Sequence, residues 1–166
     1  EGKDNYSFKW GKMALSMMEL KKILIDSGLL TKELMQRMSQ SFDKTIYKHM
    51  KYKDIYDSLE NMKKDGRSIA DYFVKKEVTE TAVYGYGVLG KKIISDLESC
   101  GIKITYVVDL EKDKFNTEYK FYTPYDVLPD TECMIITPVF AEQEIIDKMK
   151  AKNIHKIVTM KEVLQN

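Results

Sequence analysis

Three glycines with the spacing G-x-G-x-x-G are the residues of this chain best suited to ligand chemistry. They are Gly85, Gly87 and Gly90, and they follow a short apolar run at residues 81–84. The first glycine of such a turn permits a tight exit from a strand, the second lets the backbone approach a phosphate, and the third lets a helix pack on the strand. A helix that begins here points its unpaired N–H groups and its positive dipole end at the turn. The motif therefore predicts a site for a phosphate-bearing ligand.

An aspartate at the end of the next apolar run fits the same kind of site. Residues 102–108 are β-like, and Asp109 follows them, 19 residues after Gly90. This is close to the spacing at which dinucleotide-binding units place an acid for ribose hydroxyls. A carboxylate there would also repel a 2′-phosphate, which favours NAD over NADP if the ligand is a dinucleotide. The alternative is that the glycines serve only backbone geometry around an empty crevice.

A second wall of the crevice is predicted where a later apolar run, residues 133–137, ends. Carboxyl ends of neighbouring parallel strands meet at the switch point where ligands bind. A proline at this position has an alternative interpretation as a simple strand stop. We expect ligand contacts from nine residues: Gly85, Tyr86, Gly87, Val88, Leu89, Gly90, Asp109, Thr137 and Pro138.

Two lysines follow the last glycine of the motif. Lys91 and Lys92 fall in the first turn of the expected helix, where they either steady a phosphate or point to solvent. The sequence alone leaves both interpretations open.

No catalytic residue and no metal site are assigned from the sequence. Cys100 and Cys133 are the only cysteines and His49 and His155 the only histidines, and their spacing fits neither a zinc site nor a disulfide framework. We expect two reduced, buried thiols and therefore a cytoplasmic protein.

Composition and charge bound the possible partners. Charged residues make up 32% of the chain but give a net charge of only +1, so we expect neither nucleic acid nor an anionic membrane as a partner. No apolar stretch approaches the length that spans a bilayer. The first residues lack both an initiator Met and a basic, apolar leader, so we expect no signal peptide, and the chain could be a fragment.

The chain divides near residue 78 into a helical segment and a β-α segment. The expected domains are a helical packing and dimerisation segment at 1–77 and a nucleotide-binding domain at 78–166. Apolar residues at three- and four-residue steps predict helices at residues 11–27, 31–46, 52–64 and 69–74. Because the helices of the β-α segment already cover its sheet, we expect the Met-rich N-terminal helices to mediate a homodimer.

The second segment alternates between strands and helices, which indicates a parallel sheet. Right-handed crossovers then predict the strand order 3-2-1-4-5, so the fold class is α/β with a Rossmann-like five-stranded sheet. Strands are expected at residues 81–84, 102–108, 120–122, 133–137 and 155–159. Helices are expected after the glycine turn, after Pro124, and at residues 142–152 and 161–164.

Residues 81–92 resemble the start of a small Rossmann-like domain of bacterial surface-polysaccharide and sugar-nucleotide proteins, which occurs alone or fused to glycosyltransferases. Residues 66–73, 106–109, 135–140 and 157–164 are similar to other parts of that domain. The resemblance implies an accessory module that binds NAD or a nucleotide sugar, with a glycosyltransferase-type partner.

Other functions stay open. One is a part of an oxidoreductase or sugar-modifying enzyme whose site is completed by a partner or by missing sequence. Another is an assembly module whose Rossmann scaffold binds nothing. The domain is also similar to the NAD-binding half of redox-sensing repressors, but residues 1–77 show no β-wing and no basic recognition helix. A dehydrogenase needs further groups for acid and base chemistry, which favours a binding module over an enzyme.

Overall fold

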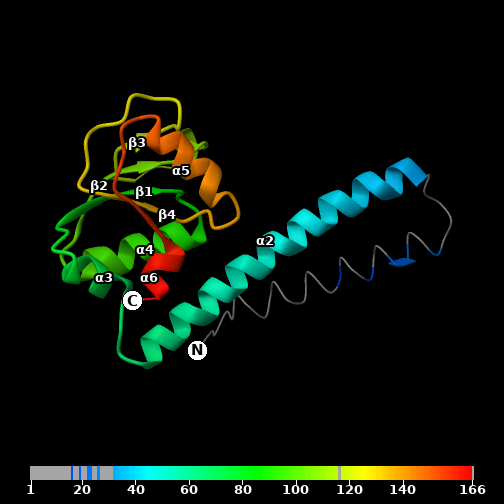
Figure 1. Ribbon diagram of the computed structural model, residues 1–166, viewed down its shortest axis with the longest axis horizontal. Coiled ribbons are helices and arrows are strands. Elements are labelled where there is room, and N and C mark those ends of the chain that lie inside the picture. The colour runs from blue at the N-terminus through cyan, green and yellow to red at the C-terminus, as the bar shows by residue number, and fades with distance from the viewer. Residues whose placement is uncertain are drawn as a thin grey trace. The chain divides into compact units, whose positions relative to one another are not determined.

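The computed structural model describes residues 16, 19, 22, 23, 26, 32–115 and 117–165 (Figure 1). The chain forms two compact units, residues 1–58 and residues 59–166. Within the helix expected at residues 11–27, the five described residues are helical, and the rest lies outside the described residues.

A five-stranded, all-parallel sheet forms the centre of the second unit. Its order is β3-β2-β1-β4-β5, which confirms the order and the α/β class predicted from the sequence. The strands are β1 (Glu80–Tyr84), β2 (Lys103–Val108), β3 (Phe121–Tyr122), β4 (Met134–Ile136) and β5 (Ile157–Thr159). The last residue of β1 pairs with Val108 on one side and with Ile136 on the other, so the carboxyl ends of the three central strands are level.

Helices cover both faces of this sheet, as Figure 1 shows, with α3, α4 and α6 on one side and α5 on the other. The helices with described bounds are α2 (Lys32–Lys64), α3 (Ile69–Lys75), α4 (Val88–Ser99), α5 (Glu142–Lys150) and α6 (Met160–Leu164), with a 3₁₀ turn η1 at Lys112–Lys114. Double coverage explains why β1 and β4 read as nearly continuous apolar runs rather than as alternating ones.

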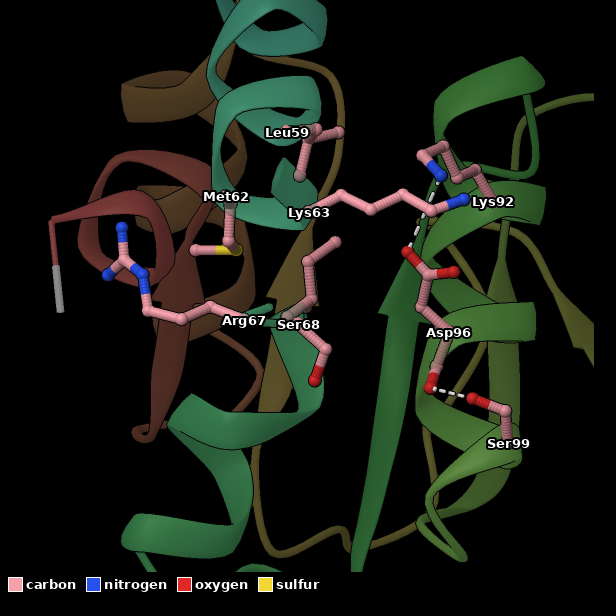
Figure 2. Close-up of a pocket in the computed structure, with 9 residues that line it drawn as sticks. Leu59, Met62, Lys63, Arg67, Ser68, Lys92, Asp96 and Ser99 are labelled. Carbon is pink, nitrogen blue, oxygen red and sulfur yellow. Dashed lines mark hydrogen bonds and ion pairs between the residues drawn. The ribbon is translucent and has the colours of Figure 1, made fainter. Parts of the chain in front are cut away.

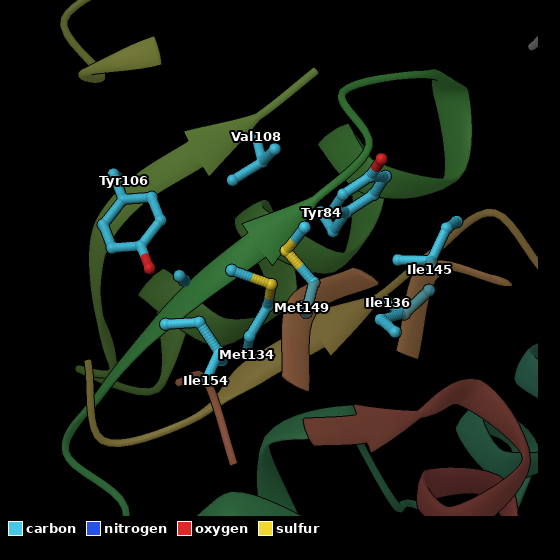
Figure 3. Close-up of a cluster of buried hydrophobic side chains, with 9 residues drawn as sticks. Tyr84, Tyr106, Val108, Met134, Ile136, Ile145, Met149 and Ile154 are labelled. Carbon is cyan, nitrogen blue, oxygen red and sulfur yellow. The ribbon is translucent and has the colours of Figure 1, made fainter. Parts of the chain in front are cut away.

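The core beneath α5 shows how the strand pattern fills one face (Figure 3). Alternate residues of the strands point to the same face, and Ile145 and Met149, one turn apart on α5, pack on them. The buried members of this cluster are Ala82, Tyr84, Tyr106, Val108, Met134, Ile136, Ile145, Met149 and Ile154. Tyr106 remains satisfied because its hydroxyl donates to the carbonyl of Pro129 at 3.0 Å.

Helix α2 is continuous, so the predicted interruption between residues 46 and 52 is wrong. The intervening segment contains no glycine or proline, and nothing else in it ends a helix. Tyr47 and Met50 lie there with 55% and 58% of their surfaces exposed. The apolar periodicity fades because these residues are exposed, not because the helix stops.

The small helix predicted after Pro124 does not form, and residues 124–126 make a turn and a bend instead. The Asp126 carboxylate accepts the N–H of Thr123 at 2.7 Å and the ammonium of Lys112 at 3.0 Å. These two bonds, the backbone bond first, lower the pKa of Asp126 and hold the chain in the turn.

Candidate functional site

The first and third glycines are required by the packing of the turn itself. Gly85 has φ +95°, in the left-handed region, and a Cβ there would lie 2.6 Å from Oγ1 of Thr137. A Cβ on Gly90 would lie 2.0 Å from the carbonyl oxygen of Gly85, which is closer than any side-chain carbon can approach. Both positions therefore confirm the roles predicted for them, a tight exit from β1 and close packing of α4.

The second glycine is not required by the packing of the chain. A Cβ on Gly87 would meet no heavy atom within 4 Å, and its φ of −69° is open to other residues. Gly87 is the N-cap of α4 and supplies no side-chain cap, although serine or aspartate would cap the helix better. A glycine here leaves the N–H groups of the first turn without a side-chain cap, and the space that its Cβ would occupy is open.

The amino end of α4 also lacks the negative charge that the other described helix starts of this unit carry. Its first turn contains no acidic residue. Carboxylates near a helix start complement the dipole and the unpaired N–H groups. The other starts have Asp71 in a capping box at α3, Glu142 and Glu144 at α5, and Glu162 in a capping box at α6. The start of α4 is thus the one of these four that an external anion can complement.

Asp109 lies beside the turn, as predicted, and its carboxylate holds the turn in place. One oxygen accepts the N–H of Tyr86 at 2.7 Å, and the other accepts the N–H of Glu111 at 2.9 Å. A carboxylate has about four acceptor positions, so these two bonds leave capacity for a ligand hydroxyl. The role that the sequence did not reveal is the internal one, in which Asp109 fixes the backbone between the first two glycines.

Tyr86 turns away from the open side of the glycine turn and into an aromatic cluster. Its ring packs edge-on against Phe115, Phe121 and Tyr119, with centroid distances of 4.9, 5.0 and 6.1 Å. The Lys91 ammonium lies 5.1 Å from the centroid of the Tyr86 ring. Tyr86 is only 8% exposed, so its side chain supports the turn, and only its backbone faces a candidate ligand.

Thr137 and Pro138 meet the turn from β4, as the predicted topology requires. The Thr137 hydroxyl lies 3.0 Å from the carbonyl of Tyr84 and 3.2 Å from that of Gly85, and it can donate to either. The ring of Pro138 comes within 3.1 Å of the position that a Cβ on Gly85 would take. Because Thr137 is only 3% exposed, its hydroxyl stabilises the junction of β1 and β4 rather than a ligand.

Exposed apolar side chains follow four neighbouring strands at this edge. Parallel strands end at the same edge of a sheet, so the loops that follow β1 to β4 share it. The exposed fractions are 58% for Val88 after β1, 65% for Leu110 after β2, 73% for Tyr125 after β3 and 43% for Phe140 after β4. Leu110 and Tyr125 were not predicted as site residues. The only feature of the sequence that could have indicated them is that each is a large apolar residue in the loop after a predicted strand.

A tyrosine at the carboxyl end of β1 stays protonated under the turn. Burial raises the pKa of Tyr84 to about 12, and the nearby carboxylates of Asp109 and Glu144 add to the shift. At neutral pH the Tyr84 hydroxyl can donate a proton in a hydrogen bond but cannot act as a base. Proton abstraction is therefore not available from this group.

The cysteines only partly follow the sequence-based expectation. Cys133 is buried, and its thiol lies 3.2 Å from the hydroxyl of Thr81, whereas Cys100 is exposed, so the prediction of two buried thiols is wrong for Cys100.

Within the described residues no cluster of three or more His, Cys, Asp or Glu side chains could hold a metal ion. In the same part of the chain, no helix has both the length and the apolar character to cross a membrane.

Comparison of the chain with protein-family models, with curated proteins and with solved structures finds no match. The edge of the sheet offers backbone N–H donors, one carboxylate and apolar side chains. Such a set of groups can bind an anion that is attached to an apolar or planar group.

Proposed function

We propose that this chain binds a phosphate-bearing nucleotide, NAD or a nucleotide sugar, at the glycine turn. The observation that carries the proposal is Gly87, which the chain's own packing does not require. A glycine at this position has a reason if a ligand atom must approach the backbone. The first turn of the helix behind it contains no acidic residue, so an anion there gains both the N–H groups and the dipole.

The remaining parts of the ligand have candidate partners around the turn. Asp109 keeps acceptor capacity for ribose hydroxyls beyond its two backbone bonds. Val88 and Phe140 offer exposed apolar surface on which a base or a sugar ring can pack. The described residues at this edge include no paired nucleophile and base, which favours a binding role over a complete enzyme. The resemblance to domains of bacterial polysaccharide proteins makes an accessory module in sugar-nucleotide metabolism our preferred setting.

Ligand-dependent thermal unfolding tests this proposal. The intact chain is heated with NAD, NADP, CoA, UDP-sugars and GDP-sugars, and the best ligand is then titrated by calorimetry. A ligand at one hundred times its Kd should stabilise the protein by about 2.7 kcal/mol. Gly87→Val should abolish binding because a branched side chain would fill the approach to the backbone, while Gly87→Ala should weaken it less. If none of these compounds binds, the Rossmann-like domain is a scaffold, as the assembly-module alternative holds.

We also propose that helix α2 mediates a homodimer. Tyr47 and Met50 lie three residues apart on this helix, and both are more than half exposed. Residues at this spacing share one helix face, and paired copies would bury it. Light scattering of the intact chain at tens of micromolar should give the mass of a dimer, and Met50→Glu should shift it toward monomer. A monomeric parent would contradict this arrangement without affecting the ligand site.

A further inference from the structure

A cavity of about 150 Å³ lies in the second unit, away from the glycine turn (Figure 2). It is formed by the carboxyl end of α2, the start of α3 and one flank of α4, and none of the nine predicted site residues lines it. The lining residues are Leu59, Met62, Lys63, Arg67, Ser68, Ile69, Lys92, Asp96 and Ser99. Its size equals that of an apolar cavity that can hold one benzene ring.

The apolar part of the lining is already rigid. Leu59, Met62 and Ile69 are 6%, 5% and 1% exposed, so they belong to the core, and only a small part of each side chain faces the cavity. Such a surface favours an apolar group over water, because water in the cavity would lack hydrogen-bond partners on that side. The floor therefore suits a ring or a short branched chain.

The polar part of the lining is dominated by positive charge. Figure 2 shows Lys63 extending from α2 toward Lys92 on α4. Lys92 is 3.6 Å from the carboxylate of Asp96, so this cation is already partly neutralised. No ion pair joins Lys63 to any residue that the structure describes. Arg67 also lines the cavity, but its guanidinium lies 3.8 Å from the carboxylate of Asp65 and points away from the two lysines in Figure 2. Two lysines against Asp96 leave a net positive charge at this side of the cavity.

The hydroxyl groups of the lining are committed to the chain. Ser99 donates to the backbone carbonyl of Asp96 at 2.8 Å, and Ser68 forms the capping box of α3 with Asp71. They hold the walls in place and leave the lysines as the groups that can meet a ligand. A ligand that satisfies the cavity must then combine an apolar body with a negative head.

From this combination we infer that the cavity is a second binding site, specific for a small organic anion that carries one ring-sized apolar group. The ligand's carboxylate or phosphate pairs with Lys63 and Lys92, and its apolar body lies against Leu59, Met62 and Ile69. The inference does not depend on the glycine turn, and it holds or fails separately from nucleotide binding.

Three probes of one shape separate the contributions of charge and apolar contact. Benzoate, benzyl alcohol and benzylamine are titrated into the intact protein at millimolar concentrations, and amide shifts of the lining residues are followed by NMR. Benzoate should bind most tightly and benzylamine least. Phenyl phosphate, tested in the Gly87→Val protein, distinguishes a phosphate from a carboxylate head without interference from the turn.

Charge variants at the cavity give effects of opposite sign. Lys63→Met removes a cation at nearly constant shape and should weaken benzoate about threefold, the effect of an exposed ion pair, while leaving benzyl alcohol unchanged. Asp96→Asn removes the competing carboxylate and should strengthen benzoate by about the same factor. Lys64→Met is the matched control, since Lys64 is the neighbouring helix lysine and does not line the cavity.

Two results would overturn the inference. One is the absence of benzoate-induced shifts at the lining residues. The other is an equal loss of benzoate affinity in Lys63→Met and Lys64→Met, which would indicate a general charge effect. Unfolding curves of the variants that coincide with the parent's exclude loss of structure as the cause.

Discussion

The two candidate sites of the second unit lie on the same helix and use different chemistry. At its amino end, α4 offers backbone N–H groups beside Gly87 and no first-turn charge. On its flank, the same helix contributes Lys92, Asp96 and Ser99 to a cavity with an apolar floor. The first site depends on backbone N–H groups that no side chain caps. The second depends on the charged and apolar side chains that line the cavity. An anion at the turn is therefore sensitive to glycine substitution, and an anion in the cavity to charge substitution.

The largest effect separates two glycines of the turn. Gly90→Ala places a methyl group 2.0 Å from the carbonyl oxygen of Gly85, so strand and helix must move apart. We expect a loss of about 3 kcal/mol in the free energy of unfolding, the upper range for overpacking. Gly87→Ala should remain within about 1 kcal/mol of the parent, since nothing lies near its Cβ. Urea unfolding measures the free energy of unfolding of both variants. Equal losses in the two variants would contradict the distinction between a glycine needed for packing and a glycine needed for a ligand.

Alkaline pH should weaken the region of the turn through Tyr84. Its pKa is 10.0 in an unfolded chain and is raised to about 12 by burial in the folded protein. The folded state therefore binds this proton more tightly, and the stability it contributes is complete below pH 10 and lost as pH rises toward 12. The loss should reach roughly 3 kcal/mol, because each tenfold difference in proton affinity between the folded and unfolded states is worth about 1.4 kcal/mol.

The measurement compares the parent with Tyr84→Phe, which has no phenol to ionise. Unfolding free energies are determined at several values between pH 9 and pH 12, with the two proteins treated alike so that the titration of lysines cancels. The parent should lose more stability than the variant over this interval. Parallel curves would show that folding does not raise the pKa of Tyr84, and would contradict the prediction.

Asp109 should affect both the turn and its ligand. Asp109→Ala removes the acceptor of two backbone N–H groups and should cost about 2 kcal/mol of stability, as for hydrogen bonds to a charged group. Binding of NAD should weaken, and discrimination against NADP should fall because the carboxylate no longer repels the 2′-phosphate. Asp96→Asn is the comparison at the cavity, where we expect no loss of stability. Equal affinity of the parent for NAD and NADP would remove the proposed ribose role.

The turn could be predicted from the sequence because its determinants are local. The glycine spacing, the apolar runs on either side and Asp109 all lie within one strand-helix-strand unit, and the strand order follows from handedness alone. The cavity could not be predicted, because its residues come from two stretches, 59–69 and 92–99, that meet only in the folded unit. The continuity of α2 was missed because exposed positions such as Met50 carry no core pattern. The internal role of Asp109 depends on the directions of the N–H groups of Tyr86 and Glu111, which the sequence pattern does not give.

The smallest effect concerns Lys91, whose role the sequence left open between phosphate and solvent. Its ammonium lies 5.1 Å from the Tyr86 ring and 5.8 Å from the Phe115 ring, so it is drawn to the aromatic cluster beside the turn. If the turn holds its anion through backbone groups, Lys91→Met should weaken nucleotide binding by no more than about 1 kcal/mol, the value of an exposed cation contact. Calorimetric titration in low and high salt checks this, with Lys63→Met as the partner variant that should leave nucleotide affinity unchanged. A tenfold or larger loss in Lys91→Met would mean that the turn, like the cavity, recognises its ligand through a side-chain charge.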